Sequence, residues 1–307
     1  MERSNPGTVG VDWTFGGSWP YEPKWFESAD GQMHYVDVGP ADGKPVVLVH
    51  GNPTWGYLYR HFIDSLAKAG HRAIVPDHLG FGRSDKPDDA KLYTVPKHAA
   101  RMTELLESLD LHDATVVCQD WGGPISLWWA TRHQERVSGL FILNTITHRP
   151  PGPVKLLAPL KLFRAAGIGE LMVKGLHMFV RVFLPFAIIK ADRFTSDVKA
   201  AYLAPHPSWS TRTAILVFPR EIPSGPEGPV ADMNGDIEEK LKEHFRTKPV
   251  RIMWAMKDWG FTPEMLDEVW LATFPDAEVT RIPDAGHYVQ EDAHEVIVPA
   301  LLDFVGR

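Results

Sequence analysis

The feature that most constrains this chain is a short apolar run that leads through one acidic residue into two glycines and a helix-forming stretch. The run is residues 114–118, the acidic residue is Asp120, and the glycines are Gly122 and Gly123. A strand that enters a sharp turn and leaves as a helix projects the turn side chain above the sheet, with the next backbone N–H free to bind a developing oxyanion. This geometry suits a nucleophile, so the sequence places Asp120 at the centre of a candidate site.

The identity of the turn residue limits the chemistry. A serine that attacked a saturated carbon would leave an ether, which an active-site water cannot hydrolyse. A carboxylate instead leaves an ester, which water and a general base can cleave. We therefore expect a substrate that carries a leaving group on carbon. The alternative is that Asp120 only caps the following helix, because Asp is a favoured N-cap residue.

Composition sets the broad class. The chain has 307 residues, 44% of them hydrophobic and 23% charged, which fits one large α/β domain or two ordinary ones. The formal charge of −7 is modest and no basic run is present, so we expect neither nucleic acid nor an anionic membrane as a partner. The single cysteine, Cys118, excludes an internal disulfide; we interpret it as a small core residue of a buried strand.

Two stretches bear on targeting. Residues 1–17 lack the apolar core of a signal peptide, so we expect a cytoplasmic enzyme. The most apolar stretch, residues 167–190, is interrupted by Glu170, Lys174 and Arg181, and is too broken for a membrane span.

Strands and helices alternate along most of the chain. Such alternation indicates a mostly parallel central sheet with helices on both faces. The expected strands are residues 25–28, 33–38, 46–49, 73–75, 114–118, 140–143, 250–255 and 278–282, and the expected helices include residues 57–69, 95–109, 236–246 and one that closes the chain.

The alternation stops from His148 to about Pro229, where apolar helical segments are broken by prolines. Because the alternation resumes afterwards, we interpret residues 148–229 as an inserted helical cap domain, and residues 1–147 with 230–307 as the core domain. Ordinary core helices would show the same hydrophobic residues, and that alternative stays open.

Four polar residues follow four predicted strands. They are Asn52, Asp120, Asp258 and His287. Functional groups of parallel α/β sheets collect beyond the carboxyl ends of the strands, so these side chains are expected to meet. Their order along the chain, with a nucleophile first, then an acid, then a histidine, is that of α/β-hydrolase triads. A histidine at a loop is more often a surface or capping residue, but the strand before His287 and this order favour catalysis.

Three motifs make the resemblance specific. They are HGNP at residues 50–53, QDWGG at residues 119–123 and DAGH at residues 284–287. With these motifs the chain resembles, over nearly its whole length, a haloalkane dehalogenase of the α/β-hydrolase superfamily. The resemblance implies an α/β-hydrolase fold with a helical cap, and hydrolysis of carbon–halogen bonds to an alcohol, a halide and a proton without cofactor or metal. Its partners would be a small halogenated aliphatic substrate and the halide ion.

The resemblance also assigns roles. Asp120 would be the nucleophile, His287 the base that activates water, and Asp258 the acid that orients His287. Asn52 and Trp121 would bind the halide through their side chains and form the oxyanion hole through their backbone N–H groups. Two neutral N–H donors suit a departing halide, because it is large and weakly basic and needs no proton.

Family members differ at two of these positions. Some take the triad acid from a Glu after the strand that follows the elbow helix, but residues 143–145 contain no carboxylate, which favours Asp258. Others use an early cap Trp as the second halide donor, whereas this segment has only Trp209, near its end, which favours Asn52.

Related activities fit the sequence less well. Epoxide hydrolases need acidic donors to the ring oxygen, normally two cap tyrosines, and residues 148–229 contain only Tyr202. Fluoroacetate dehalogenases place arginines beside the nucleophile, where this chain has none, and the cofactor-free luciferases on this scaffold resemble the branch with the earlier Glu. A catalytically silent ligand-binding protein of the same fold remains the alternative outside enzymes.

Overall fold

The computed structural model describes residues 10–307. The first nine residues lie outside the described part. They include about half of residues 1–17, the stretch that lacks the apolar core of a signal peptide, and the start of the predicted core segment 1–147.

The sheet has eight strands in the order β1-β2-β4-β3-β5-β6-β7-β8. Strand β2 runs antiparallel to both of its neighbours, β1 and β4. All remaining neighbouring strands, from β4 to β8 in the sheet order, pair in parallel. The central strands β3 and β5 are buried along their whole length, as expected for apolar runs covered on both faces. The bounds are β1 (Lys24–Ser28), β2 (Gly31–Val38), β3 (Pro45–Val49), β4 (Arg72–Pro76), β5 (Ala114–Cys118), β6 (Val137–Leu143), β7 (Val250–Ala255) and β8 (Glu278–Ile282).

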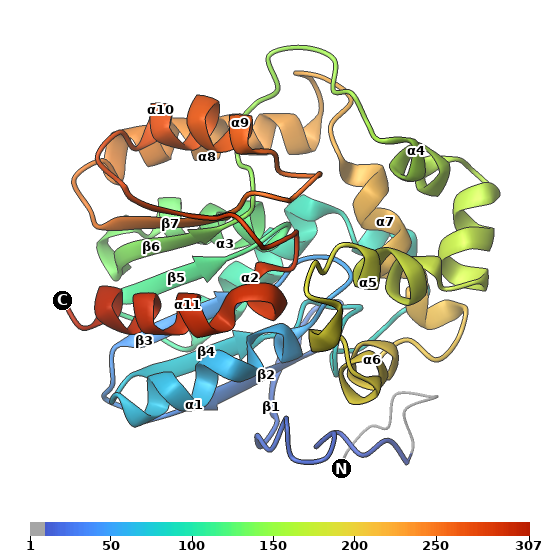
Figure 1. Cartoon of the computed structure of the whole chain (residues 1–307), viewed down its shortest axis with the longest axis horizontal. Helices are drawn as coiled ribbons and strands as arrows, with labels where there is room; N and C mark the ends of the chain where they lie inside the picture. Colours follow the sequence, from blue (N-terminus) through green and yellow to red (C-terminus); the bar gives the residue numbers. More distant parts are fainter. Residues whose placement is uncertain (1–9) are drawn as a thin grey trace.

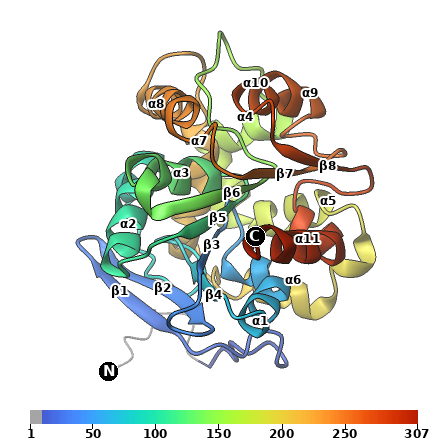
Figure 2. The same cartoon turned by 90° about the vertical axis from the view of Figure 1, so that its left-hand side faces the viewer.

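Helices cover both faces of the sheet (Figure 2). Helices α1 (Arg60–Lys68) and α11 (Val289–Val305) pack together on one face, while α2 (Val95–Ser108), α3 (Gly122–Arg132) and α8 (Pro229–His244) pack in sequence on the other. Shorter helices, η1 (Gly56–Tyr59), η2 (Ala90–Leu92), η3 (Gln134–Arg136), α9 (Pro263–Met265), η8 (Leu266–Trp270) and α10 (Leu271–Thr273), connect these elements. The predicted architecture, a mostly parallel sheet between two helical layers, is confirmed.

One helix boundary differs from the sequence prediction. Helix α8 begins at Pro229, seven residues before the predicted start at 236, and ends at His244. Gly235 lowers the intrinsic helix propensity of this stretch, which hides the helix in the sequence. Burial of Val230 and Met233 against the core outweighs that preference. The first residue of α8 is therefore the last residue of the predicted cap segment.

Residues 148–229 contain no strand and form a helical layer at the right of Figure 1, beyond the end of the sheet where the parallel strands terminate. These helices pack mainly on one another. They are α4 (Ala158–Arg164), the π-helical turns η4 (Glu170–Gly175) and η5 (Phe179–Phe183), α5 (Leu184–Phe186), η6 (Ala191–Arg193), α6 (Ser196–Leu203), η7 (Ser210–Arg212) and α7 (Thr213–Glu221). We call residues 148–229 the helical segment.

Buried polar contacts fasten the helical segment to the rest of the chain. The Trp55 indole N–H donates to the carbonyl of Ala201 over 3.0 Å. The Tyr202 hydroxyl donates to the carboxylate of Glu291, which also accepts two hydrogen bonds from the Arg60 guanidinium. Within residues 10–307, no helix combines the length and the apolar character that crossing a lipid bilayer requires.

Candidate active site

The predicted sharp turn lies between β5 and α3. Asp120 has a φ of 51°, in the left-handed region that side chains other than glycine seldom adopt. This conformation lifts the Asp120 side chain away from the sheet, while its own N–H donates to the carbonyl of Asn144 over 2.9 Å. In the described part of the chain, no side chain caps the N-terminus of α3. The structure therefore does not support the alternative in which Asp120 serves only as a helix cap.

Two glycines make room for this turn. A Cβ atom on Gly122 would overlap the backbone carbonyl oxygen of Val49, so α3 starts closer to β3 than any other residue would allow. A Cβ atom on Gly51 would overlap the carboxylate of Asp120. Both positions require glycine because a Cβ atom would not fit. The close approach at Gly122 explains why the sequence has a glycine two residues after Asp120.

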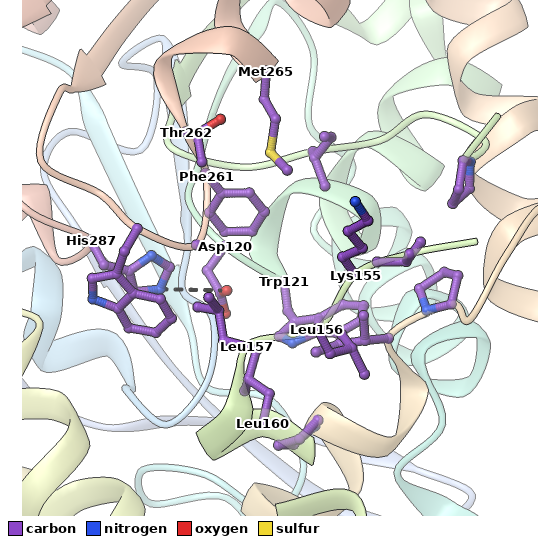
Figure 3. A pocket seen from close by; sticks show the side chains of 18 of the residues that line it. Asp120, Trp121, Lys155, Leu156, Leu157, Leu160, Phe261, Thr262, Met265 and His287 are labelled. Carbon is purple, nitrogen blue, oxygen red and sulfur yellow. Dashed lines mark ion pairs between the residues drawn. The ribbon is translucent and has the colours of Figure 1, made fainter. Parts of the chain in front are cut away.

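The Asp120 carboxylate is almost enclosed and is held by backbone groups. Its Oδ1 accepts the N–H of Asn52 over 2.8 Å, and the N–H of Trp121 also contributes. The Oδ2 lies 3.6 Å from Nε2 of His287 (Figure 3). Burial raises the pKa of Asp120 above its ordinary value, and the imidazole of His287 and the two N–H donors offset only part of that rise. The carboxylate is thus more basic than one in water.

The imidazole of His287 is fixed on its other side by Asp258. Nδ1 of His287 lies 2.9 Å from Oδ2 of Asp258, and because a carboxylate only accepts, Nδ1 carries the hydrogen and Nε2 faces Asp120. Burial disfavours the imidazolium, but the charge and hydrogen bond of Asp258, together with Asp120, outweigh burial and raise the pKa of His287.

Asp258 is oriented by the turn in which it lies. Its side chain is fully buried, and Oδ1 accepts the N–H groups of Gly260 and Phe261 over 2.8 and 3.1 Å. One oxygen therefore binds the turn and the other binds His287. The ring of Phe261 stacks on the imidazole of His287, with 5.6 Å between the ring centroids.

Asn52 and Trp121 both contact the Asp120 carboxylate through their backbone N–H groups, and both line the same cavity. The side-chain Oδ1 of Asn52 is buried and has no hydrogen-bond partner among the described residues. The Trp121 ring packs against Phe218, with centroids 5.3 Å apart. The structure therefore brings four of the five predicted site residues together around one cavity, with Asp258 behind His287, and Figure 3 shows Asp120, Trp121 and His287 facing the cavity.

The cavity has a volume of about 780 Å³ and a mostly apolar wall. Its floor comes from the strand ends and its roof from the helical segment, so the Asp120 carboxylate meets an environment that contains few competing hydrogen-bond donors. Wall residues include Leu156, Leu157, Leu160, Phe179, Phe183, Pro219, Ile222, Phe261 and Met265. Among residues 10–307 no group of His, Cys, Asp and Glu side chains is arranged to hold a metal ion.

Two positioning residues were not predicted from the sequence. The side-chain amide of Gln119 donates to the carbonyl of His287 over 3.0 Å, which connects the residue before Asp120 to the loop that carries His287. Gln119 belongs to the QDWGG motif, so the sequence indicated that this residue matters. The sequence did not indicate that its partner is the carbonyl of His287. Asp292, in the first turn of α11, had no such signal.

The buried carboxylate of Asp292 joins the histidine loop to the helical segment. Its Oδ2 accepts the N–H groups of Gly286 and Ile189 over 2.7 and 3.1 Å, and its Oδ1 accepts that of Lys190 over 2.8 Å. Gly286 also lies so close to the carbonyl of Ala187 that a Cβ atom would overlap it. The residue before His287 is therefore held against the helical segment by one carboxylate.

Comparison with known proteins gives the family. A family model described as alpha/beta hydrolase fold matches residues 44–294. The chain belongs to the α/β-hydrolase family. A haloalkane dehalogenase of Psychrobacter cryohalolentis is 34% identical over 284 residues, covering 91% of this chain and 89% of the relative. Haloalkane dehalogenases are thus among the homologues of this α/β-hydrolase, as the sequence motifs indicated.

A second sequence relative and a solved structure give further information on the family. A protein of Xanthomonas campestris named cis-3-alkyl-4-alkyloxetan-2-one decarboxylase is 36% identical, covering 94% of this chain and 97% of the relative. The crystal structure of haloalkane dehalogenase DbeA from Bradyrhizobium elkani superposes with a TM-score of 0.84 at 27% identity, covering 93% of this chain and 97% of that one. The scaffold of this α/β-hydrolase is that of the dehalogenase structures, and its sequence relatives carry two different activity names.

We expect Asp292→Asn to lower the free energy of unfolding by about 2 kcal/mol, because an amide oxygen cannot serve all three buried N–H groups and at least one is left unpaired. Urea unfolding measures this change. The matched control is Glu295→Gln in the same helix, a carboxylate whose side chain is 44% exposed and which pairs with the half-buried cations Lys190 and Arg193 near the surface. The control should change the unfolding free energy by no more than about 0.5 kcal/mol. Equal effects of the two substitutions would contradict the role given to Asp292.

Proposed function

We propose that this α/β-hydrolase is a haloalkane dehalogenase, which converts a halogenated alkane and water into an alcohol, a halide ion and a proton. The observation that carries the proposal is the placement of the Asp120 carboxylate. It faces an apolar cavity, is held between the N–H groups of Asn52 and Trp121, and has a histidine with its own carboxylate partner behind it.

In the first step the Asp120 carboxylate attacks the carbon that bears the halogen. A bond forms between a carboxylate oxygen and carbon, and the halogen leaves with the electron pair of the broken bond. The side-chain amide of Asn52 and the indole N–H of Trp121 would bind the departing halide. The apolar wall supports this step because it removes water that would otherwise shield the carboxylate.

In the second step water cleaves the ester. His287 removes a proton from the water through Nε2, and the resulting hydroxide attacks the ester carbonyl carbon of Asp120. The backbone N–H groups of Asn52 and Trp121 stabilise the oxyanion. The alcohol leaves, Asp120 is regenerated, and Asp258 stabilises the imidazolium until its proton is released.

The electrostatics of the site suit this order of events. Asp120 is one of the groups that raise the pKa of His287. When Asp120 becomes a neutral ester, that contribution disappears and the pKa of His287 falls. The intermediate itself therefore favours the neutral imidazole, which is the form that can act as a base.

In this proposal the helical segment 148–229 acts as the cap domain, and residues 1–147 with 230–307 form the catalytic core domain. The support is the cavity wall, which combines strand-end residues such as Asp120 with residues of the helical segment such as Phe179 and Leu160. The cytoplasmic location expected from the sequence stays a prediction.

Decarboxylation of an oxetan-2-one is the second candidate function. It is favoured by the relative of that name at 36% identity. An oxetan-2-one also presents a saturated carbon whose bond to a carboxylate oxygen can break, so the same nucleophile and the same N–H donors face a leaving group on carbon. The cavity of about 780 Å³ has room for two alkyl chains.

Epoxide hydrolysis and silent ligand binding gain no support from the contacts. Tyr202, the one tyrosine of the helical segment, donates its hydroxyl to Glu291 and is not part of the cavity wall, so it is not available to an epoxide oxygen. Tyr288 lines the cavity, but its hydroxyl is engaged with the carbonyl of Asn52 over 3.3 Å. A silent binding protein would not need a carboxylate at Asp120 that faces a histidine hydrogen-bonded to Asp258.

The proposed activity is tested by halide release from 1-bromobutane and 1,2-dibromoethane with the purified protein. We expect release by the wild type and none by Asp120→Ala. A cis-3,4-dialkyloxetan-2-one and a panel of epoxides are assayed in parallel. Alkene and carbon dioxide from the oxetanone without halide release would establish the second candidate and overturn the first.

We expect His287→Phe to be alkylated but not to turn over, because the nucleophile remains while the base is lost. Intact-protein mass spectrometry after incubation with 1-bromobutane should show one added butyl group. The double variant Asp120→Ala/His287→Phe, treated in the same way, should stay unmodified. Normal turnover by His287→Phe would contradict the two-step mechanism.

We expect Trp121→Phe to weaken bromide binding by roughly tenfold, because it removes one hydrogen bond to an anion, worth about 1.5 kcal/mol or more. Inhibition of turnover by added bromide and quenching of tryptophan fluorescence both report this affinity. Trp128→Phe is the matched control, since Trp128 lies on the same helix, stacks with Arg132 and does not line the cavity. It also corrects the fluorescence for the loss of one of the 11 tryptophans. Unchanged bromide affinity in Trp121→Phe would remove Trp121 from the halide site.

A further inference from the structure

Charge is distributed unevenly between the two parts of the chain. The helical segment, residues 148–229, contains 11 Lys and Arg residues against 5 Asp and Glu, which gives it a formal charge of +6. The rest of the chain has a formal charge of −13, because the whole carries −7. The modest net charge of the whole chain is therefore the sum of a basic helical segment and an acidic remainder.

Exposed apolar side chains are concentrated in the same layer. Within residues 10–307, 11 large hydrophobic residues are exposed, and 9 of them belong to residues 157–209. Phe186 is the most exposed of them, at 72%. The nine are Leu157, Leu162, Ile168, Leu171, Leu176, Val182, Phe186, Ile189 and Trp209. Single exposed apolar residues are ordinary, but this clustering in one part of a chain marks an interaction surface.

The two properties coincide in residues 155–190, whose exposed side chains we call the basic apolar face. It includes eight of the nine exposed hydrophobic residues and three exposed cations, and the one carboxylate of this stretch, Glu170, is half-buried and pairs with Arg220. Lys155, Lys161 and Arg181 are exposed and form no ion pair within residues 10–307. The elements that carry the face, α4 to α5, succeed one another along the side of the molecule away from the sheet (Figure 1).

We propose that the basic apolar face binds the surface of an anionic lipid bilayer. Apolar side chains that enter the headgroup region, together with unpaired cations that remain at the lipid phosphates, are the combination that holds a protein at an interface without crossing it. A helix that spans the bilayer is not required, and none is present in residues 10–307. This proposal replaces the expectation drawn from the total charge, which averaged two unlike parts of the chain.

The position of the cavity agrees with this orientation. Lys155 and Leu157 are exposed on the face and also line the cavity, so the cavity wall is continuous with the docking surface. A bound bilayer would therefore lie beside the route by which an apolar substrate enters.

A second copy of the chain fits the face less well. In a twofold contact of the face with itself, the unpaired cations of each copy would meet those of the other. Lysine, which supplies two of its three exposed cations, is also depleted at interfaces between proteins.

The test is flotation of the purified full-length protein with vesicles of phosphatidylcholine alone or mixed with phosphatidylglycerol. We expect binding to the mixed vesicles only, with a decrease as salt is added. Lys161→Glu/Arg181→Glu should weaken binding roughly tenfold or more, because each cation near an anionic surface contributes separately. Leu162→Gln/Leu171→Gln/Phe186→Gln should also abolish flotation.

Matched controls alter equivalent residues elsewhere on the surface. Lys68→Glu/Lys97→Glu changes exposed lysines of α1 and α2, and Val296→Gln changes an exposed hydrophobic residue of α11; all should float like the wild type. Thermal unfolding of every variant checks that the fold is kept. Wild type that fails to bind mixed vesicles would overturn the proposal. So would variants of the face that bind normally, or that change only the oligomeric state, since that result would assign the face to self-association. Vesicle binding is measured without substrate, so its outcome is independent of the proposed activity.

Discussion

The site depends on holding the Asp120 carboxylate ionised beside an apolar cavity. Burial raises its pKa, which makes the carboxylate a better nucleophile but also favours its protonation. The N–H groups of Asn52 and Trp121 and the imidazole of His287 counter the second effect without adding a permanent cation. The left-handed φ of Asp120 places its side chain within reach of both N–H groups and of the histidine.

The same balance permits more than one leaving group. Neutral N–H donors stabilise any weakly basic anion that departs from carbon, whether a halide or the carboxylate of an opening oxetanone ring. In the proposed hydrolysis, the proton is handled by a separate pair, His287 and Asp258. Relatives that carry two activity names on one scaffold are therefore chemically reasonable, since the catalytic groups act on the bond to carbon and the cavity wall determines which substrate presents it.

Features set by the local sequence were predicted well. The strands, the turn at Asp120 and the positions of Asn52, Asp258 and His287 follow from apolar runs that end in polar residues, because parallel strands bring their carboxyl ends to one edge. Asp292 could not be found in this way, since its three partners are backbone N–H groups that leave no mark in the sequence. The early start of α8 was missed because packing of Val230 and Met233 outweighs the unfavourable Gly235.

The contacts of the Asp292 carboxylate limit which sequence changes the helical segment can accept without disturbing the histidine loop. The helical segment contributes a large part of the cavity wall, so a change of that wall would fall on this segment while the sheet stays the same. Yet Ile189 and Lys190 share their acceptor with Gly286, the residue before His287. A graft between relatives therefore has to preserve the backbone path at residues 187–190, because altering it would move His287 together with the new wall.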